Sequence, residues 1–511
     1  MLSTTPSTPV REALLRRHAR AAGLCLVVVI GGCAAVGPDF KPIDVQAPPR
    51  WADRHGGSPA LGAPASAASA PPADRWAVFG DQELQRLQAR ALQANQDIRI
   101  GVLRLMEARV QETMVSAQHG LQAAAQGGVT RERQSEYGGA SRLINAIGGS
   151  GASPLRSALS APFTLYQAGF DASWEPDLWG RVLRSEEVAR ADSQGQEAAL
   201  RQVHLGVVAE VARLYFTLRS ARLQEQLAQE QLGVARETEG LLQAQYGNGI
   251  ADDSALLRQR TRVASLRAAL PSLQAEQASA MNGIALLVGA SPGELNDELS
   301  STRMSLGDVV LPDLRLGLPG EFVRHRPDIR VAESRLHSAT ANIGVAVADL
   351  YPRVILGADF GLESAGSAKF ADWGSRQWSV GPSLSLPLWD HGRRRSTVAL
   401  RELQQQEAAV AFQQSVLAAW REVDDAISAY RAESLRDGEL SERVRNSAED
   451  VLLSQARYDG GLTDFLGVLS ARAILLDARR DGVDGKAHLY LSLAALYKAL
   501  GDDDSLPVES Q

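Results

Sequence analysis

Two kinds of hydrophobic pattern alternate along the chain. Stretches with apolar residues at every second position predict β-strands that have one apolar face and one face of small polar residues. They cover about residues 121–131, 166–174, 354–362 and 378–388, the first being the weakest. Two proline-free runs, 180–246 and 392–458, carry apolar residues three and four apart, which predicts very long helices with a coiled-coil seam. Each run ends in a glycine-containing turn before a second helix, so a mainly helical chain with two helical hairpins and four strands is expected.

The same order of elements occurs twice. Gly180-Arg181 recurs as Gly392-Arg393, and the same offset holds without insertion or deletion as far as Gly289 and its counterpart Gly501. An earlier segment, Asp97-Ile98-Arg99, recurs at a slightly larger offset as Asp328-Ile329-Arg330. Internal repeats of this length are structural units that pack against each other. The predicted fold is therefore an internal duplication.

The alternation in the strands allows two interpretations. A strand of a transmembrane barrel needs an apolar face toward lipid and a polar face toward water. A half-buried sheet of a soluble protein shows the same pattern. Four strands cannot close a barrel that spans a membrane, so the first interpretation requires an oligomer, and three copies would supply twelve strands and twelve helices.

The segment 1–33 has the pattern of an export signal. Basic residues precede the apolar segment from Ala21 to Ile30, which is too short to span a bilayer as a helix. The segment ends in Gly31-Gly32-Cys33, which is typical of a bacterial lipoprotein signal with lipid on Cys33. A plain secretory signal with an incidental cysteine is the alternative. Since Cys25 lies inside the apolar segment, cleavage leaves Cys33 as the sole thiol, which excludes a disulfide framework.

Composition excludes several classes of function. The chain has 511 residues, 45% of them hydrophobic, and a net charge of −7 with acidic and basic residues well mixed. The chain has no block of basic residues that would indicate nucleic-acid binding. The eight histidines are scattered, and no metal, phosphate-loop or nucleophile motif is present, so no catalysis and no cofactor other than a covalent lipid on Cys33 are expected.

The expected organisation follows from these patterns. It comprises a signal peptide (1–32), a lipid-anchored segment and linker rich in Pro and Ala (33–80), a first repeat (81–289), a connection (290–320), a second repeat (321–501) and a tail (502–511).

Several motifs together resemble one family. They are the run from Cys33 to Pro42 (CAAVGPDFKP), Arg326-Pro327-Asp328-Ile329, the segment from Ala339 to Pro352, and the two glycine turns. With the duplication, they resemble the outer-membrane factor family of TolC-like channels, and within it the NodT-type lipoproteins. The resemblance covers essentially the whole mature chain.

The resemblance implies a homotrimer in the outer membrane, with a twelve-stranded barrel and a helical tunnel that crosses the periplasm. It also implies two partners, a periplasmic adaptor (membrane fusion protein) and an inner-membrane pump, often of the resistance-nodulation-division class. The expected function is a passive exit duct for small molecules such as drugs and toxic compounds. Type I protein secretion is the alternative client, and a structural coiled-coil lipoprotein without a pore is the other alternative.

The resemblance also carries two sets of residues. The tips expected to contact the adaptor are Gly249, Ile250, Ala251 and, in the second copy, Gly461, Leu462 and Thr463. Ala251 departs from the small hydroxyl residue that the family has there. A periplasmic aperture is expected at Arg445, Glu449 and Asp450, where carboxylates around a threefold axis would favour cations. A solvated helix face, or an ion pair between residues one turn apart, is the alternative for these three.

Overall fold

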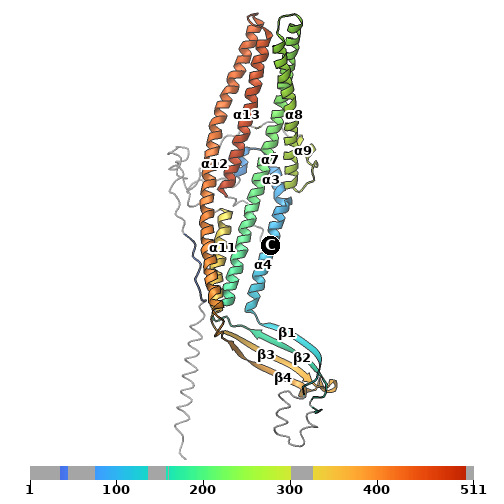
Figure 1. Cartoon of the computed structure of the whole chain (residues 1–511), viewed down its shortest axis with the longest axis vertical. Helices are drawn as coiled ribbons and strands as arrows, with labels where there is room; N and C mark the ends of the chain where they lie inside the picture. Colours follow the sequence, from blue (N-terminus) through green and yellow to red (C-terminus); the bar gives the residue numbers. More distant parts are fainter. Residues whose placement is uncertain are drawn as a thin grey trace, which may run out of the picture. The chain divides into compact units, whose positions relative to one another are not determined.

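The computed structural model describes residues 35–43, 75–135, 157–158, 160–300, 306 and 326–501 (Figure 1). The strands are β1 (Gln122–Glu132), β2 (Phe163–Trp174), β3 (Arg353–Ser364) and β4 (Arg376–Ser385). The helices are α3 (Gln82–Ala94), α4 (Gln96–Ser116), α7 (Arg181–Gly247), α8 (Asp253–Leu287), α9 (Asn296–Ser300), α11 (Pro327–Ala348), α12 (Arg393–Asp459) and α13 (Phe465–Leu500). Short 3-10 turns lie at Arg75–Phe79, Ala117–His119, Ser367–Lys369 and Trp373–Ser375.

The chain divides into two compact units, and each takes segments from both halves of the sequence. Of the described residues, the strand unit contains 35–41, 108–135, 157–158, 160–193 and 335–408. The hairpin unit contains the described residues within 42–107, 194–334 and 409–501. The strand unit therefore holds the whole sheet, and the hairpin unit holds both helical tips.

The two long helices are the repeated element that the sequence predicts. α7 and α12 each have 67 residues, and their first residues, Arg181 and Arg393, are counterparts in the repeat. Gly180 and Gly392, directly before them, have φ angles of 73° and 84°, a conformation in which a side chain would be strained. The duplication and the mainly helical fold with four strands are thereby confirmed.

The return helices α8 and α13 end in matched joints. At the end of α8 the side chain of Asn95 donates to the carbonyl of Leu287 at 3.0 Å. At the end of α13 the guanidinium of Arg326 donates to the carbonyl of Ala499. Leu287 and Ala499 occupy equivalent positions in the two copies, so each copy satisfies the same unpaired carbonyl with a different side chain.

The core of the hairpin unit is built around aromatic side chains. Phe79, Phe216 and Tyr490 are buried and lie within 4.8 to 5.9 Å of one another, measured between ring centroids. Asp81 caps the start of α3 and also accepts hydrogen bonds from Tyr215 and Arg219. A single carboxylate thus ties α3 to α7 beside the aromatic cluster.

The four strands form one antiparallel sheet in the order β1-β2-β3-β4 (Figure 1). In the first hairpin Gln122 pairs with Ser173, and in the second the equivalent residues Arg353 and Ser385 pair. The duplication therefore extends to the register of the strands. β4 ends at Ser385, before the predicted end at residue 388, and Pro387 just beyond it has no N–H for a ladder.

One face of the sheet is apolar and exposed in the single chain. Phe170, Trp378 and Val380 are 67%, 67% and 72% exposed. A half-buried soluble sheet would cover such side chains, so the exposed apolar face favours the transmembrane interpretation. The opposite face carries polar and acidic residues, among them Gln126, Gln167, Asp171, Asp359, Glu363 and Gln377.

Strands β2 and β3 approach closely at a pair of glycines. Gly169 and Gly361 are paired across the strands, and a Cβ atom on Gly169 would lie 2.8 Å from the carbonyl oxygen of Phe360. The polar face therefore has no room for a side chain at this point.

Candidate functional site

Each helical hairpin ends in the same turn. At the first tip the N–H of Ile250 donates to the carbonyl of Gln245 at 2.9 Å, and the N–H of Gly249 donates to the carbonyl of Tyr246 at 3.0 Å. The second tip has the equivalent bonds, from Leu462 to Arg457 at 2.8 Å and from Gly461 to Tyr458 at 2.9 Å. This pair of bonds is the Schellman motif, which requires a left-handed residue. Gly249 and Gly461 supply it with φ angles of 73° and 68°.

The turn leaves one aliphatic side chain uncovered at each tip. Ile250 is 74% exposed and Leu462 is 81% exposed. A hydrophobic residue at this position of a Schellman motif usually packs back on its own helix. Here both side chains instead remain open to solvent and are available to another protein.

The next helix is capped in the same way at both tips. Asp252 accepts from the N–H of Ala255 at 2.7 Å, and Asp464 accepts from the N–H of Gly467 at 3.1 Å. The residue before each cap differs, since Ala251 stands where the second tip has Thr463. The two tips thus share a backbone, but the position before the cap carries a hydroxyl group in the second tip and none in the first.

The residues predicted for the aperture lie on the last turns of α12. Arg445, Glu449 and Asp450 are all exposed. Within the described part of the chain none of the three makes an ion pair, although Arg443, close by, pairs with Asp481 at 2.5 Å. The intrahelical pair between Arg445 and Glu449 is therefore not formed, and the two carboxylates remain free for a role in the assembled protein.

One carboxylate on α13 joins the two hairpins inside the hairpin unit. Asp477 accepts from the buried side chain of Gln231 on α7 at 2.8 Å and from Arg262 on α8 at 3.2 Å. Sequence reasoning missed this contact, because a lone Asp among many on a helix face carries no motif.

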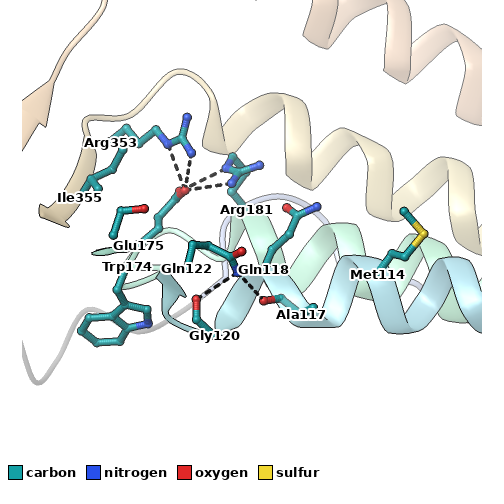
Figure 2. A pocket seen from close by; sticks show the side chains of 11 residues that line it. Met114, Ala117, Gln118, Gly120, Gln122, Trp174, Glu175, Arg181, Arg353 and Ile355 are labelled. Atoms are coloured by element: carbon teal, nitrogen blue, oxygen red, sulfur yellow. Dashed lines mark hydrogen bonds and ion pairs between the residues drawn. The ribbon is translucent and has the colours of Figure 1, made fainter. Parts of the chain in front are cut away.

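A hollow of about 380 Å³ lies at the end of the polar face of the sheet. Figure 2 shows Glu175 between the guanidinium groups of Arg181 and Arg353, at distances from 2.7 to 3.2 Å. Met114 and Ile355 add apolar surface to the lining. The charges form an internal network, so the hollow is a polar joint between strand ends and helix ends. It, too, was missed by sequence reasoning.

The N-terminal segment is held on the strand unit by a set of contacts that we call the strap clasp (residues 35–40 with α7 and α11). The N–H of Val36 donates to the carbonyl of Trp179 at 3.1 Å. Arg184 donates to the carboxylate of Asp39 at 2.6 Å and to the carbonyl of Val36 at 3.3 Å. The ring of Phe40 stacks on His337 at 4.3 Å. The predicted lipidation site, Cys33, lies outside the described residues.

Electrostatics reinforces the strap clasp. Glu187 accepts from Arg184 at 2.7 Å and lies 2.8 Å from the ring of His337. Burial opposes ionisation of Glu187, but the hydrogen bonds from Arg184 and His337 outweigh it, so the pKa of Glu187 is lowered. The clasp therefore contains a carboxylate that stays ionised at neutral pH between two donors.

Two further observations concern the described residues alone. They contain no group of three or more side chains that could hold a metal ion. None of their helices has a stretch long and apolar enough to cross a membrane.

Comparison with known proteins shows the family to which the chain belongs. Residues 87–290 and 318–502 match the family model of the outer membrane efflux protein. The cation efflux system protein CusC of Escherichia coli (strain K12) is 28% identical over 93% of this chain and 98% of its own length. The outer membrane protein OprJ of Pseudomonas aeruginosa is 31% identical over 82% of this chain and 84% of its own. The solved structure of the outer-membrane channel OprN aligns at a TM-score of 0.77 and 30% identity, over 92% of this chain and 99% of that one.

These matches agree with the duplicated hairpins, the sheet with one exposed apolar face, and the exposed tips. The resemblance drawn from the sequence is confirmed, and the chain belongs to the outer membrane efflux protein family, whose members are outer-membrane channels.

Proposed function

We propose that three copies of this chain form a passive exit duct for small molecules across the outer membrane and the periplasm. The observation that carries the proposal is a four-stranded sheet with one exposed apolar face and two edges that no other strand of the described residues pairs, in a chain with helices of 67 residues. Four strands cannot enclose a pore, whereas twelve can. Each long helix has a length of about 100 Å at a rise of about 1.5 Å per residue, which suits a tunnel through the periplasm.

The tips are the proposed contacts for a periplasmic adaptor. The exposed side chains of Ile250 and Leu462 offer two small apolar anchors, each on a rigid glycine turn. A few buried anchors carry most of the binding energy at protein interfaces. Because Thr463 adds a hydroxyl where the first tip has Ala251, we expect the two tips to bind the adaptor with different strength.

The proposed aperture lies at Arg445, Glu449 and Asp450. Their exposure and the absence of an ion pair among the described residues support a role that appears only in the trimer. Carboxylates brought together on a threefold axis favour cations.

A covalent lipid on Cys33 is the proposed membrane anchor. The strap clasp supports it, because the clasp begins at Ala35, only two residues after Cys33. An acyl chain on Cys33 would thus be held close to the end of the sheet.

The proposed energy source is an inner-membrane pump, of the resistance-nodulation-division class, reached through the adaptor. A small-molecule client is supported by the similarity to a cation efflux protein over 93% of the chain. Type I protein secretion is the alternative client, and a coiled-coil lipoprotein without a pore is the alternative to the channel.

Conductance of the purified protein in planar lipid bilayers tests the proposal. Discrete current steps from a trimeric preparation are expected. A folded trimer that never conducts would replace the channel by the non-pore lipoprotein. The client is tested in cells that lack the protein: sensitivity to small toxic compounds is expected, whereas loss of a secreted protein from the medium would indicate protein secretion.

A further inference from the structure

The hollow beside Glu175 has a surplus of positive charge. Of the charged residues that line it, Arg181 and Arg353 are cationic and Glu175 is anionic. Burial opposes ionisation of Glu175, but the hydrogen bonds and charges of the two arginines outweigh it, so the pKa of Glu175 is lowered. Glu175 therefore stays ionised at neutral pH and compensates one of the two positive charges.

The single carboxylate does not use all the donors around it. A guanidinium group carries five N–H donors. Arg181 donates to Glu175 through Nε and Nη2 at 3.2 and 3.0 Å, and Arg353 donates through the same two atoms at 3.0 and 2.7 Å. The Nη1 group of each arginine has no hydrogen-bond partner among the described residues. Both guanidinium groups lie at the same end of the hollow, around Glu175, so their Nη1 groups are available to an anion there (Figure 2).

Other carboxylates near the arginines do not enter the hollow. The hydrogen bond to Glu175 raises the pKa of Arg181 against the effect of burial, and the charges of Asp349 and Asp177 add to the increase. Neither aspartate lines the hollow, and Asp177 already accepts a hydrogen bond from a backbone N–H at 2.8 Å. The side chain of Arg353 is 54% exposed and that of Arg181 is 25% exposed. Arg353 is therefore the cation that a dissolved ligand reaches first.

Glutamine side chains add neutral donors to the lining. Gln118 and Gln122 both line the hollow and are both exposed. Gln122 donates to the carbonyl of Ala117 at 3.0 Å, which fixes its side chain. The side chain of Gln118 makes no hydrogen bond to any described residue. Both N–H groups of the Gln118 amide can therefore be given to a ligand.

Apolar surface completes the lining. Met114 is 61% exposed and Ile355 is half-buried, and both line the hollow. The ring of Trp174 is held in place, because its Nε1 donates to the carbonyl of His119 at 3.0 Å. Apolar walls with a few convergent polar groups are typical of sites for small organic molecules, and a volume of about 380 Å³ lies in the usual range for them. An inorganic anion would leave the apolar walls unused.

The second half of the chain does not repeat this set of residues. The counterpart of Glu175 is Pro387, and the counterpart of Gln118 is Asp349. The second half thus passes from strand to helix without the carboxylate, and it has a carboxylate where the first half has a neutral donor. The charged network is therefore not a requirement of this kind of joint, and it needs another reason.

From these contacts we infer that the hollow binds a small amphipathic anion, whose carboxylate or sulfonate group lies between Arg353 and Gln118 and whose apolar body lies on Met114 and Ile355. Guanidinium groups bind such oxyanions through paired hydrogen bonds. The hollow is complete in the single chain. That its ligands are among the exported solutes rests on the proposed function, in which the polar face of the sheet is turned toward water.

Binding of naphthalenesulfonate to the purified full-length protein in detergent tests the inference, with isothermal titration calorimetry as the measurement. The uncharged naphthalenesulfonamide has the same apolar body, so it is the control for partition into detergent. Saturable binding of the sulfonate is expected. The sulfonamide is expected to bind roughly tenfold more weakly or not at all, because it cannot form a charge-assisted hydrogen bond.

Two substitutions in the charged network should act in opposite directions. Arg353→Gln is expected to weaken sulfonate binding roughly tenfold or more, since the most accessible cation is lost. Glu175→Gln is expected to strengthen binding about two- to fivefold, because it removes the carboxylate that competes for both arginines. A gain of affinity distinguishes a binding site from a purely structural joint, whose disruption would not improve binding.

A third substitution leaves the network intact. Gln118→Glu adds a carboxylate at an exposed position of the hollow, so it should weaken sulfonate binding without lowering the melting temperature. It tests the site even if Arg353→Gln does not fold. Gln134→Glu is the matched control, because it adds the same charge at an exposed position beyond the other end of β1. This control should bind the sulfonate as the unchanged protein does.

The possible failures can be told apart. Sulfonate binding that Arg353→Gln and Gln118→Glu leave unchanged would overturn the site. Equal binding of the sulfonamide, or no saturable binding of the sulfonate by the unchanged protein, would overturn the class of ligand. Conductance of the same samples in planar bilayers tests the duct separately: a conducting protein that does not bind the sulfonate rejects the hollow alone, and a protein that binds it without conducting rejects the duct alone.

Discussion

Gly37 and Gly344 lie so close that a Cβ atom on Gly37 would stand 2.5 Å from the Cα of Gly344. Gly37 also has a φ angle of 92°, which a side chain would strain. The segment thus approaches α11 backbone to backbone. The strap clasp is therefore a specific contact, with a glycine on each side: Gly37 in the N-terminal segment and Gly344 on α11.

The substitution Gly37→Ala is expected to release residues 35–40 from α7 and α11. The clash with the backbone of α11 adds to the strain at φ, and such strain costs about 1–3 kcal/mol. Hydrogen exchange of the Val36 amide, which donates to Trp179, measures the release and should accelerate roughly tenfold or more. Gly392→Ala is the matched control, because Gly392 also has a positive φ but no neighbour within 4 Å of its Cβ position. If both variants accelerated exchange at Val36 equally, the close contact would not be what holds the strap.

Acid is expected to weaken the strap clasp. A carboxylate whose pKa is lowered by folding stabilises the native state above its unfolded pKa, near 4.5, and that contribution is lost as the pH falls through the lowered value. The donors around Glu187 are Arg184 and His337, and Asp39 faces the same arginine. The melting temperature of Glu187→Gln should thus lie below that of the unchanged protein at pH 7 and approach it below pH 4.5.

The control for the acid experiment is Glu197→Gln, which removes one partner of a partly exposed ion pair with Arg201, one turn away on the same helix. Exposed pairs contribute little to stability. If Glu187→Gln lowered the melting temperature by the same amount at pH 7 and at pH 3, the charge of Glu187 would not contribute to stability.

Two glycines at the first tip should respond in opposite directions to alanine. Gly249 has a positive φ, so Gly249→Ala is expected to cost about 1–2 kcal/mol. Gly247 is the last residue of α7 and has open space around its Cβ position, so Gly247→Ala should stabilise the helix end by about 0.4–1 kcal/mol. Exchange of the Ile250 amide reports both effects, and a slower exchange in Gly249→Ala would contradict the Schellman geometry. Gly461→Ala should repeat the result at the second tip.

The aperture prediction concerns the two free carboxylates on α12. Removing a carboxylate from a ring at a constriction widens the ring and lowers its attraction for cations. Glu449→Ala and Asp450→Ala are therefore expected to raise single-channel conductance in planar bilayers and to reduce the preference for cations. Asp425→Ala, at an exposed position farther from the tip on the same helix, serves as the control. Conductance that Glu449→Ala and Asp450→Ala leave unchanged would retain the channel and move the gate elsewhere.

Much of the fold could be predicted because it is repeated and periodic. The two long helices begin and end within one or two residues of the proline-free runs, and each ends at a glycine turn that the backbone requires. The strands were visible from alternation, and even the weak stretch near 121–131 appears as β1. The end of β4 was predicted at residue 388, whereas the strand ends at Ser385. The alternation continues to Leu388, but Pro387 has no N–H with which to join the ladder.

The contacts between distant residues could not be predicted from the sequence. Neither the link from Asp477 to Gln231 and Arg262 nor the Glu175 network has a local signature, because each depends on which helix faces meet. The strap was visible as a motif, but its binding site was not. The tips were placed correctly on exposed turns, whereas their adaptor contacts and the aperture stay predictions.

The two joints at the ends of the return helices differ in one physical respect. Asn95 is neutral, whereas Arg326 is also bound to Asp328 and Glu422 at 2.8 and 2.6 Å. Arg326 is only 6% exposed, so salt screens its attraction to the two carboxylates weakly. Removing either carboxylate leaves a buried cation with one partner fewer, which is costly, whereas the joint at Asn95 carries no charge that could be left unpaired. Two halves that share one plan therefore differ in how strongly they depend on a neighbouring charge, and the joint at Arg326 is the one that a single lost carboxylate weakens.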